Sequence, residues 1–307
     1  MANLKVIRKR ISSVKSTQKI TRAMKLVAGA RLTRAQQRIV SLRPYAEGVS
    51  DVLQDIAYNI AHSAGHDALS LPVFSEDVHP LLARREEKSI MLVVLTSDKG
   101  LCGSFNTNIC KAAFNIWKAE EAQGKRVDFA IVGRKGRDYF RRRGASIHDY
   151  WENIWNDLSL DTIRPGVRRL LQPFLRKEHD AIKLVYNEFQ NAAVQNVAQK
   201  TLLPIQYKRS EERTSEIWQS PPLYIVEPNR GAVAEALIPA YIEVTILRAL
   251  FESMASELGA RMTAMDAATK NAKEMIASLT LQYNKARQAA ITKELMEIIG
   301  GSEAIKE

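Results

Sequence analysis

The 307-residue chain has few cysteines, no long apolar run and no acidic residue near its N-terminus. Its two cysteines, Cys102 and Cys110, are too few for a disulfide framework or a cysteine metal cluster, and they fit a reducing compartment. No stretch approaches the roughly 18–20 apolar residues of a membrane span, and residues 1–10 lack the apolar core of a secretory signal. We therefore expect a soluble chain with one or two domains.

The positive charge is concentrated in one segment. Residues 1–43 contain twelve Lys and Arg and no Asp or Glu, so the other residues hold 45 − 12 = 33 basic against 34 acidic side chains. The whole excess of +11 belongs to this segment, which predicts an acidic partner: nucleic acid, lipid headgroups or an acidic protein. Residues 1–44 contain no Phe, Trp or Tyr, which disfavours single-strand binding and a membrane-surface helix but leaves duplex binding open.

Both ends of the chain are patterned as long helices. Apolar residues from Leu4 to Val14 follow the 3-4-3 spacing of a coiled coil, and the pattern resumes after Pro44 and ends near Ser63. A similar pattern runs from Leu247 to Ile298, with no proline after Pro239. We expect these helices to pair antiparallel, with the second extending past the first.

The middle of the chain alternates compact apolar runs with helical stretches, which predicts a mostly parallel sheet covered on both faces. The predicted strands are Ser89–Leu95, Val127–Val132, Ile182–Phe189 and a shorter Leu223–Val226; the predicted helices are Phe105–Glu121, Arg134–Arg143 and Leu160–Leu175. The predicted fold class is thus mixed α/β: a long antiparallel coiled coil of the terminal helices with an inserted Rossmann-like, three-layer domain. The predicted boundaries are 1–63 for the first helix, 64–88 for a linker, 89–228 for the inserted domain and 229–307 for the second helix.

The glycines after the first two strands resemble phosphate-binding loops only weakly. Gly100 and Gly103 form a GxxG, and Gly133 and Gly136 form another, but neither has the GxGxxG or P-loop spacing. Tight strand–helix turns need glycine in any case, so we interpret Gly100 and Gly103 as structural turn residues. A nucleotide-dependent α/β enzyme remains an alternative that predicts stoichiometric nucleotide binding.

Candidate catalytic and metal residues are isolated. No histidine lies near Cys102 in sequence, so a small buried thiol is favoured over a nucleophile. The five histidines show no HxxxH spacing, and no CxxC exists. We therefore expect no catalytic residue, no cofactor and no metal. Arg141–Arg143 end a predicted helix, where cations complement the helix dipole.

Four segments carry a family resemblance that covers essentially the whole chain in order. They are Ile11–Ala30 (ISSVKSTQKITRAMKLVAGA), Thr96–Asn106 (TSDKGLCGSFN), Glu257–Asn271 (ELGARMTAMDAATKN) and Tyr283–Leu295 (YNKARQAAITKEL). They resemble the gamma subunits of F-type ATP synthases. Two positions depart from the family pattern: Lys270 stands where aspartate is common, and Ser104 where glycine is usual.

The resemblance implies a non-catalytic rotor shaft in the central stalk. The helices would form a left-handed coiled coil inside a ring of three alpha and three beta subunits, and the inserted domain would contact the epsilon subunit and the c-ring. Proton flow through the c-ring would turn the shaft and drive ATP synthesis at the beta sites, with hydrolysis as the reverse. The expected location is peripheral, on the cytoplasmic side of the bacterial inner membrane. A basic, helical nucleic-acid-binding protein is the alternative.

The resemblance also assigns contact residues toward the alpha/beta ring. The cations of the first helix, taken as unpaired, would attract acidic beta loops without fixed direction. By motif position, Met24 and Lys25 face those loops, and Arg261 lies on the opposing helix. Arg287, Gln288, Thr292 and Glu294 would hydrogen-bond beta, and the apolar end would turn in an apolar sleeve. The full predicted contact set is Arg8, Arg22, Met24, Lys25, Arg261, Arg287, Gln288, Thr292, Glu294, Leu295 and Ile298.

Overall fold

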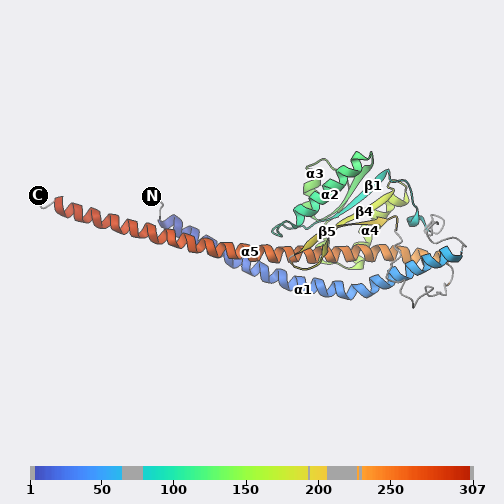
Figure 1. The fold of residues 1–307 in the computed structure, drawn as a ribbon, viewed down its shortest axis with the longest axis horizontal. Helices are drawn as coiled ribbons and strands as arrows, with labels where there is room; N and C mark the ends of the chain where they lie inside the picture. The colour runs from blue at the N-terminus through green and yellow to red at the C-terminus, as the bar shows by residue number, and fades with distance from the viewer. Residues whose placement is uncertain (1–3, 64–78, 193, 206–226, 228–229, 305–307) are drawn as a thin grey trace. The chain divides into compact units, whose positions relative to one another are not determined.

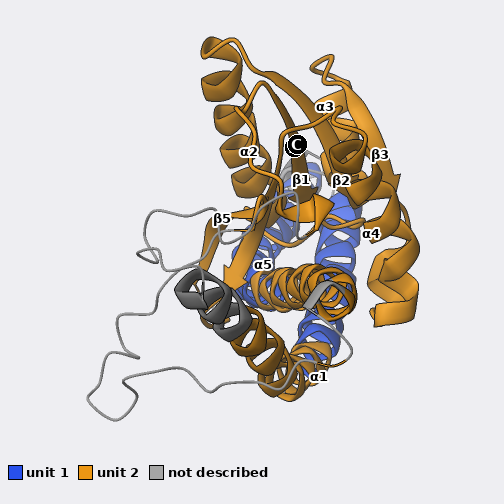
Figure 2. Cartoon of the chain, turned by 90° about the vertical axis from the view of Figure 1, so that its right-hand side faces the viewer, with its two compact units in different colours: residues 1–30, 261–307 blue, residues 31–260 orange. Residues whose placement is uncertain are grey.

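The computed structural model describes residues 4–63, 79–192, 194–205, 227 and 230–304. It divides into two compact units, shown in Figure 2. Unit 1 combines residues 1–30 with 261–307, and unit 2 is the continuous stretch 31–260. The helices α1 (Leu4–Ser63) and α5 (Arg230–Ala304) each contribute residues to both units.

The centre of unit 2 is a five-stranded sheet with strand order β3-β2-β1-β4-β5. Its strands are β1 (Ser89–Leu95), β2 (Arg126–Val132), β3 (Ile147–Trp151), β4 (Ala181–Phe189) and β5 (Gln195–Leu203). The first four are parallel, and only β5 pairs antiparallel, along β4. From β1 the chain adds β2 and β3 on one side of the sheet, and it then returns to add β4 and β5 on the other side of β1. The carboxyl ends of β1 and β4 are therefore the topological switch point of the fold.

Helices cover both faces of this sheet (Figure 1). On one face lie α2 (Phe105–Ala122) and α3 (Arg134–Arg141), where Phe129 and Phe140 pack with ring centroids 4.5 Å apart. On the other face lie α4 (Leu160–Leu175) and the unit 2 part of α5. The predicted three-layer, mostly parallel arrangement is therefore confirmed.

Central strands were predictable because both of their faces are buried. The observed β1 and α4 have the predicted bounds, and β2 and β4 each begin one residue earlier than predicted. The edge strands β3 and β5 were missed. Each has an exposed or half-exposed face and a polar sequence, IHDYW and QNVAQKTLL, so neither forms the continuous apolar run used to predict strands.

Two prolines lie inside the long helices. The prediction that the first helix continues through Pro44 to Ser63 is confirmed. The second helix begins at Arg230, one residue after the predicted start at 229, and continues through Pro239. Burial of Ile238 and Ile242 in the core beneath the sheet favours the helix on both sides of this proline, against the local cost of one lost hydrogen bond.

Part of the predicted 64–88 linker belongs to the core. A short 3-10 helix, Pro80–Leu82, lies beside α4 and places Leu81 and Leu82 in the core cluster that also contains β1 side chains. A second 3-10 helix spans Ile154–Asn156. The rest of the linker up to residue 78, and the predicted strand Leu223–Val226, lie outside the described residues. None of the described helices is both long enough and apolar enough to cross a membrane.

Unit 1 consists of two antiparallel helical segments, one from α1 and one from α5. Thr21 and Thr269 share a hydrogen bond of 2.8 Å between their hydroxyl oxygens, and both Ala28 and Met265 are buried. Gly29 lies beside Met262, whose sulfur would be 3.5 Å from a Cβ at that position. Small residues on α1 thus let the helices approach closely, and the contacts of Thr21 with Thr269 and of Lys25 with Asp266 confirm the predicted antiparallel pairing.

Candidate functional site

The interhelix contacts of unit 1 fix the level at which α1 and α5 face each other. Thr21 faces Thr269, and Lys25 faces Asp266. Because the helices are antiparallel, the residue numbers of facing positions add up to about 290. Leu4 therefore lies near the level of residue 286, and the described part of α5 continues to Ala304. In Figure 1, the C-terminal end of α5 lies beyond the N-terminal end of α1. The second helix extends past its partner, as predicted.

This overhang presents apolar side chains to solvent. Leu295 is 53% exposed and Ile298 is 69% exposed, and the neighbouring Met296 and Ile299 are similar. Gln288, Thr292 and Glu294 are also exposed along the same stretch. Contiguous exposed apolar side chains on a helix are typical of a surface that a partner covers. The predicted contact residues of the tip are thus accessible to a partner.

The basic residues of α1 are exposed, with one exception in unit 1. Arg8 and Arg22 point into solvent, whereas Lys25 is half-buried and its Nζ lies 2.6 Å from Oδ1 of Asp266. The expectation that all twelve cations are unpaired is therefore wrong for Lys25. An interhelix partner 241 residues away in sequence leaves no local signal. Met24 and Arg261 are half-buried.

The loops at the carboxyl ends of β1 and β2 bind each other. The backbone N–H of Arg134 donates to Oδ1 of Asp98 at 2.9 Å, and that of Gly136 donates to Oγ1 of Thr96 at 2.9 Å. The N–H of Lys135 donates to the carbonyl of Ser97 at 3.1 Å. The first-turn donors of α3 that would hold a phosphate are therefore used within the chain.

Backbone geometry tests whether the positions of the loop glycines require glycine. Gly103 has φ 57°, and Gly133 has φ 92° with Thr96 so close that an added Cβ would lie 2.1 Å from its carbonyl oxygen. A Cβ added at Gly100 would lie 3.8 Å from Cε of Lys135, an ordinary contact distance. The geometry of Gly103 and Gly133 favours turn residues over a phosphate site, whereas Gly100 has room for a Cβ and no positive φ, so nothing there requires glycine.

The thiols lie in the interior. Cys102 is buried near Ser97 and Asn106, and its sulfur is 3.1 Å from Nδ2 of Asn106. Burial raises the pKa of the Cys110 thiol to about 12. A thiol with so high a pKa carries almost no thiolate at neutral pH and is a poor nucleophile.

One histidine is also buried. Nε2 of His179 lies 2.8 Å from Oδ2 of Asp128, and Arg126 approaches the same oxygen at 3.1 Å. The pKa of His179 is lowered: burial is the largest cause and lowers it, while the hydrogen bond and the charge of Asp128 raise it. Across the described residues, no group of three or more His, Cys, Asp or Glu side chains is placed to hold a metal ion.

A partly buried ion-pair network that sequence reasoning missed joins β4 to α2. Lys183, buried on a central strand, has Nζ 2.7 Å from Oε1 of Glu120 and 2.9 Å from Oε2 of Glu87. Lys125 binds the second oxygen of Glu120 at 2.7 Å. Burial raises the pKa of Glu120, but hydrogen bonds from both lysines outweigh it and leave that pKa lowered. All four groups are paired with one another, so the network braces the domain.

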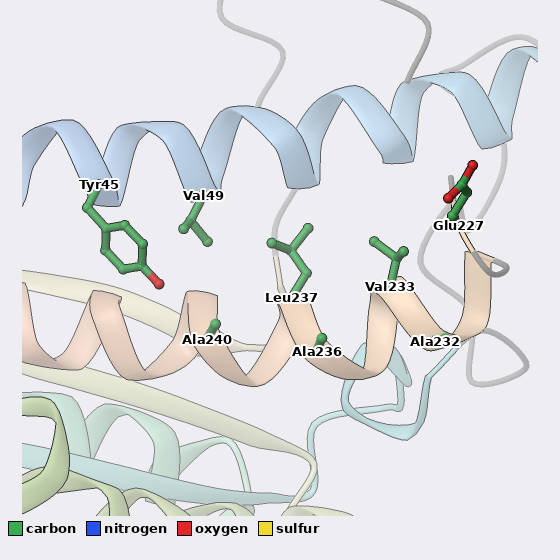
Figure 3. Close-up of a pocket in the computed structure, with 8 residues that line it drawn as sticks. All are labelled: Tyr45, Val49, Glu227, Ala232, Val233, Ala236, Leu237 and Ala240. Atoms are coloured by element: carbon green, nitrogen blue, oxygen red, sulfur yellow. The ribbon is translucent and has the colours of Figure 1, made fainter. Parts of the chain in front are cut away.

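A groove of about 330 Å³ lies between α1 and the start of α5 within unit 2 (Figure 3). Ala232, Ala236 and Ala240 follow one another along α5, and Tyr45 and Val49 project from α1. Apart from the Tyr45 hydroxyl and the Glu227 carboxylate, the lining side chains are apolar. The groove contains no nucleophile paired with a base.

These features define a class: proteins built from two antiparallel terminal helices, with a Rossmann-like domain inserted between them in the sequence. The ATP synthase family profile matches residues 3–305. The "ATP synthase gamma chain" of Sorangium cellulosum is 54% identical and that of Geobacter metallireducens 44% identical, each over 100% of both chains. A chain of the Euglena gracilis mitochondrial ATP synthase structure (OSCP/F1/c-ring) has the same fold, with a TM-score of 0.64 at 18% identity over 98% of this chain and 94% of that one.

The chain belongs to the ATP synthase gamma chain family. This confirms the resemblance stated from the sequence motifs. The comparisons give no support to the nucleic-acid alternative.

Proposed function

We propose that this chain is the central-stalk rotor shaft of a proton-translocating F-type ATP synthase. It couples rotation of the c-ring to ATP synthesis or hydrolysis at catalytic sites held by the alpha and beta subunits. The chain itself supplies no catalytic residue, cofactor or metal. Its partners are three alpha and three beta subunits, the epsilon subunit and the c-ring, at the cytoplasmic side of the bacterial inner membrane.

The observation that carries this proposal is the contrast between the two helices of unit 1. The α1 segment has exposed cations and no acidic residue, and the α5 segment overhangs it with exposed apolar side chains. A basic surface attracts acidic loops over a distance without fixing one geometry, which suits a contact that must be made and broken repeatedly. An apolar tip suits an apolar bearing that tolerates rotation, because hydrophobic contact is not directional.

The predicted contact residues divide between these two surfaces. Arg8, Arg22 and Lys25 would face acidic loops, with Met24 and Arg261 beside them. Arg287, Gln288, Thr292 and Glu294 would hydrogen-bond the ring, and Leu295 and Ile298 would occupy the bearing. The predicted boundaries at 63 and 228 remain part of this proposal, with the inserted domain turned toward the c-ring and epsilon.

Reconstitution tests the proposal. The purified chain is mixed with alpha and beta subunits, and assembly and ATP hydrolysis are measured; the complex is then rebuilt on membrane-embedded c-rings, and ATP synthesis is measured under a proton gradient. The expected result is an assembly whose hydrolysis and proton-driven synthesis both depend on this chain. A chain that neither assembles nor supports synthesis contradicts the assignment. Salt-sensitive duplex binding in place of assembly would favour the nucleic-acid alternative.

A further inference from the structure

Asp266 in unit 1 is shared by two lysines from different helices. Its Oδ1 lies 2.6 Å from Nζ of Lys25 on α1, and its Oδ2 lies 3.0 Å from Nζ of Lys270 on α5. The side chains of Lys25, Asp266 and Lys270 are 40%, 32% and 73% exposed. Hydrogen bonds from Lys25, and next from Lys270, hold the pKa of Asp266 below its ordinary value. The carboxylate thus stays charged at neutral pH and offers one oxygen to each lysine.

The two ion pairs are independent in geometry. The pair with Lys270 is within α5 at a spacing of four residues, in the order acid then base that is favourable on a helix. The pair with Lys25 crosses between helices. Because each lysine uses its own oxygen, Asp266 keeps a cationic partner when either lysine leaves.

Replacement of Asp266 by another carboxylate as the partner of Lys25 therefore costs little free energy. Exposed and half-exposed ion pairs are weak, so Lys25 is not fixed to Asp266. Releasing Lys25 costs free energy mainly because it would leave the Asp266 carboxylate unpaired at the helix interface. Lys270 lowers this cost because it stays paired with Asp266. Arg22, exposed and within one turn of Lys25, adds to the attraction for an incoming anion.

We propose that Lys270 is a positioning residue that acts through Asp266: by holding this carboxylate, it frees Lys25 to exchange Asp266 for a carboxylate on an acidic partner loop. This deepens the proposed function and rests on it for the identity of the partner, an acidic protein loop of the surrounding ring. Lys25 then alternates between two partners: Asp266 within the chain and a carboxylate on the partner loop.

A static brace is the competing interpretation. In that case the Lys25–Asp266 pair only fixes the level of the two helices, together with the hydrogen bond between Thr21 and Thr269. Lys25 would stay on Asp266 when an acidic peptide is present, and Lys270 would affect neither.

Zero-length carbodiimide coupling separates the two interpretations in the full-length chain alone. An acetylated synthetic peptide of Asp and Glu is added, coupling is started, and mass spectrometry measures the fraction of Lys25 joined to the peptide. The variants are Lys270→Gln, Asp266→Asn and the double variant. Lys273→Gln is the matched control, since it removes another exposed cation on the same helix three residues further along.

The expected result has four parts. Lys25 couples to the peptide in the parent chain. Lys270→Gln lowers that yield about two- to threefold, the size of one exposed ion pair, and Lys273→Gln lowers it less. Asp266→Asn raises the yield, and in that background Lys270→Gln has no larger effect than Lys273→Gln.

Three results overturn the inference. They are no coupling of the peptide at Lys25, equal effects of the Lys270 and Lys273 changes in the parent chain, and an effect of Lys270→Gln that persists undiminished in the Asp266→Asn chain. Because no other subunit is present, a failure here is distinct from a failure of the rotor assignment, which is measured by assembly and ATP synthesis.

Discussion

Arg22 and Lys25 lie three residues apart on α1 but have different surroundings. Arg22 is exposed, whereas Lys25 is half-buried and paired with Asp266 at 2.6 Å. Reversing the charge of Lys25 would place a carboxylate next to Asp266, and repulsion within unit 1 would follow. Arg22 is therefore the cleaner probe of attraction toward a partner.

For Arg22→Glu we expect weakened coupling with intact folding. The free energy of unfolding of the isolated chain should change by no more than about 0.5 kcal/mol, as for most exposed positions. Proton pumping per ATP hydrolysed in the reconstituted complex should fall severalfold. Lys111→Glu, at an exposed position on α2, is the control and should leave coupling unchanged. Equal losses of folding and coupling in Arg22→Glu would refute the electrostatic account of this helix.

His179 gives the inserted domain a dependence on pH. Burial lowers its pKa below the ordinary 6.5, so between 6.5 and the lowered value the unfolded chain binds a proton that the folded chain does not. Stability should thus fall on acidification in this window, with a slope of at most about 1.4 kcal/mol per pH unit. The lowered pKa of Asp128 contributes stability that is lost only below pH 3.8, so it does not act in this window.

Urea unfolding at pH 7.5 and 5.5 measures this effect. His179→Gln, which can still donate a hydrogen bond to Asp128, should reduce the difference in unfolding free energy between the two pH values. Part of the difference should remain, because burial also lowers the pKa of His79. His148→Gln, at an exposed position, should keep it. An unchanged pH dependence in His179→Gln would show that another group is responsible.

At the scale of elements, what could be predicted depended on burial. Strands β1, β2 and β4 are apolar along their length because both faces are covered, and the helices α2 and α4 carry long amphipathic patterns. The edge strand β5 is polar and pairs with only one neighbour, so its sequence carries no strand signal of that kind. Ion pairs such as Lys183–Glu120 depend on which elements meet, and sequence spacing does not encode that.

The turn after β2 gives a sharp test of the glycine interpretation. Gly133→Ala should destabilise the chain by about 3 kcal/mol or more, because its Cβ would meet the Thr96 carbonyl at 2.1 Å and its φ is 92°. Gly124→Ala also has positive φ, 77°, but meets nothing within 4 Å, so it should cost only about 1 kcal/mol. Gly100→Ala should be nearly neutral. Thermal or urea unfolding of the three variants measures the order, and a Gly133→Ala chain as stable as Gly124→Ala would contradict this packing.

The overhanging end of α5 should matter for assembly and not for folding. Leu295→Asp combined with Ile298→Asp changes two exposed side chains, so unfolding of the isolated chain should shift by no more than about 0.5 kcal/mol. In an apolar bearing the same charges would be desolvated at a cost of several kcal/mol. ATP hydrolysis by the complex should therefore fall at least tenfold. Leu101→Asp, at an exposed apolar position of the inserted domain, is the control; equal losses in both would argue against a bearing at the tip.

At the scale of the molecule, the sequence motifs led to the right family, and the charge count located the basic segment. The fold class followed from hydrophobic patterning, since two long helical patterns flank an alternating strand–helix region. The pairing of Lys25 with Asp266 did not follow, because the level at which two helices meet is set by side-chain packing along the whole contact. That pairing changes the account of the basic surface from a row of free charges to one in which Lys25 has an internal partner.

Observation of rotation tests the rotor assignment most directly. A complex of alpha, beta and this chain is fixed to a surface through beta, and a bead is attached to an introduced surface cysteine in the inserted domain. Labelling can be selective because Cys102 and Cys110 are both buried. The account predicts that ATP drives continuous rotation of the bead in one direction. ATP hydrolysis by a complex that retains the chain while the bead stays still would contradict it.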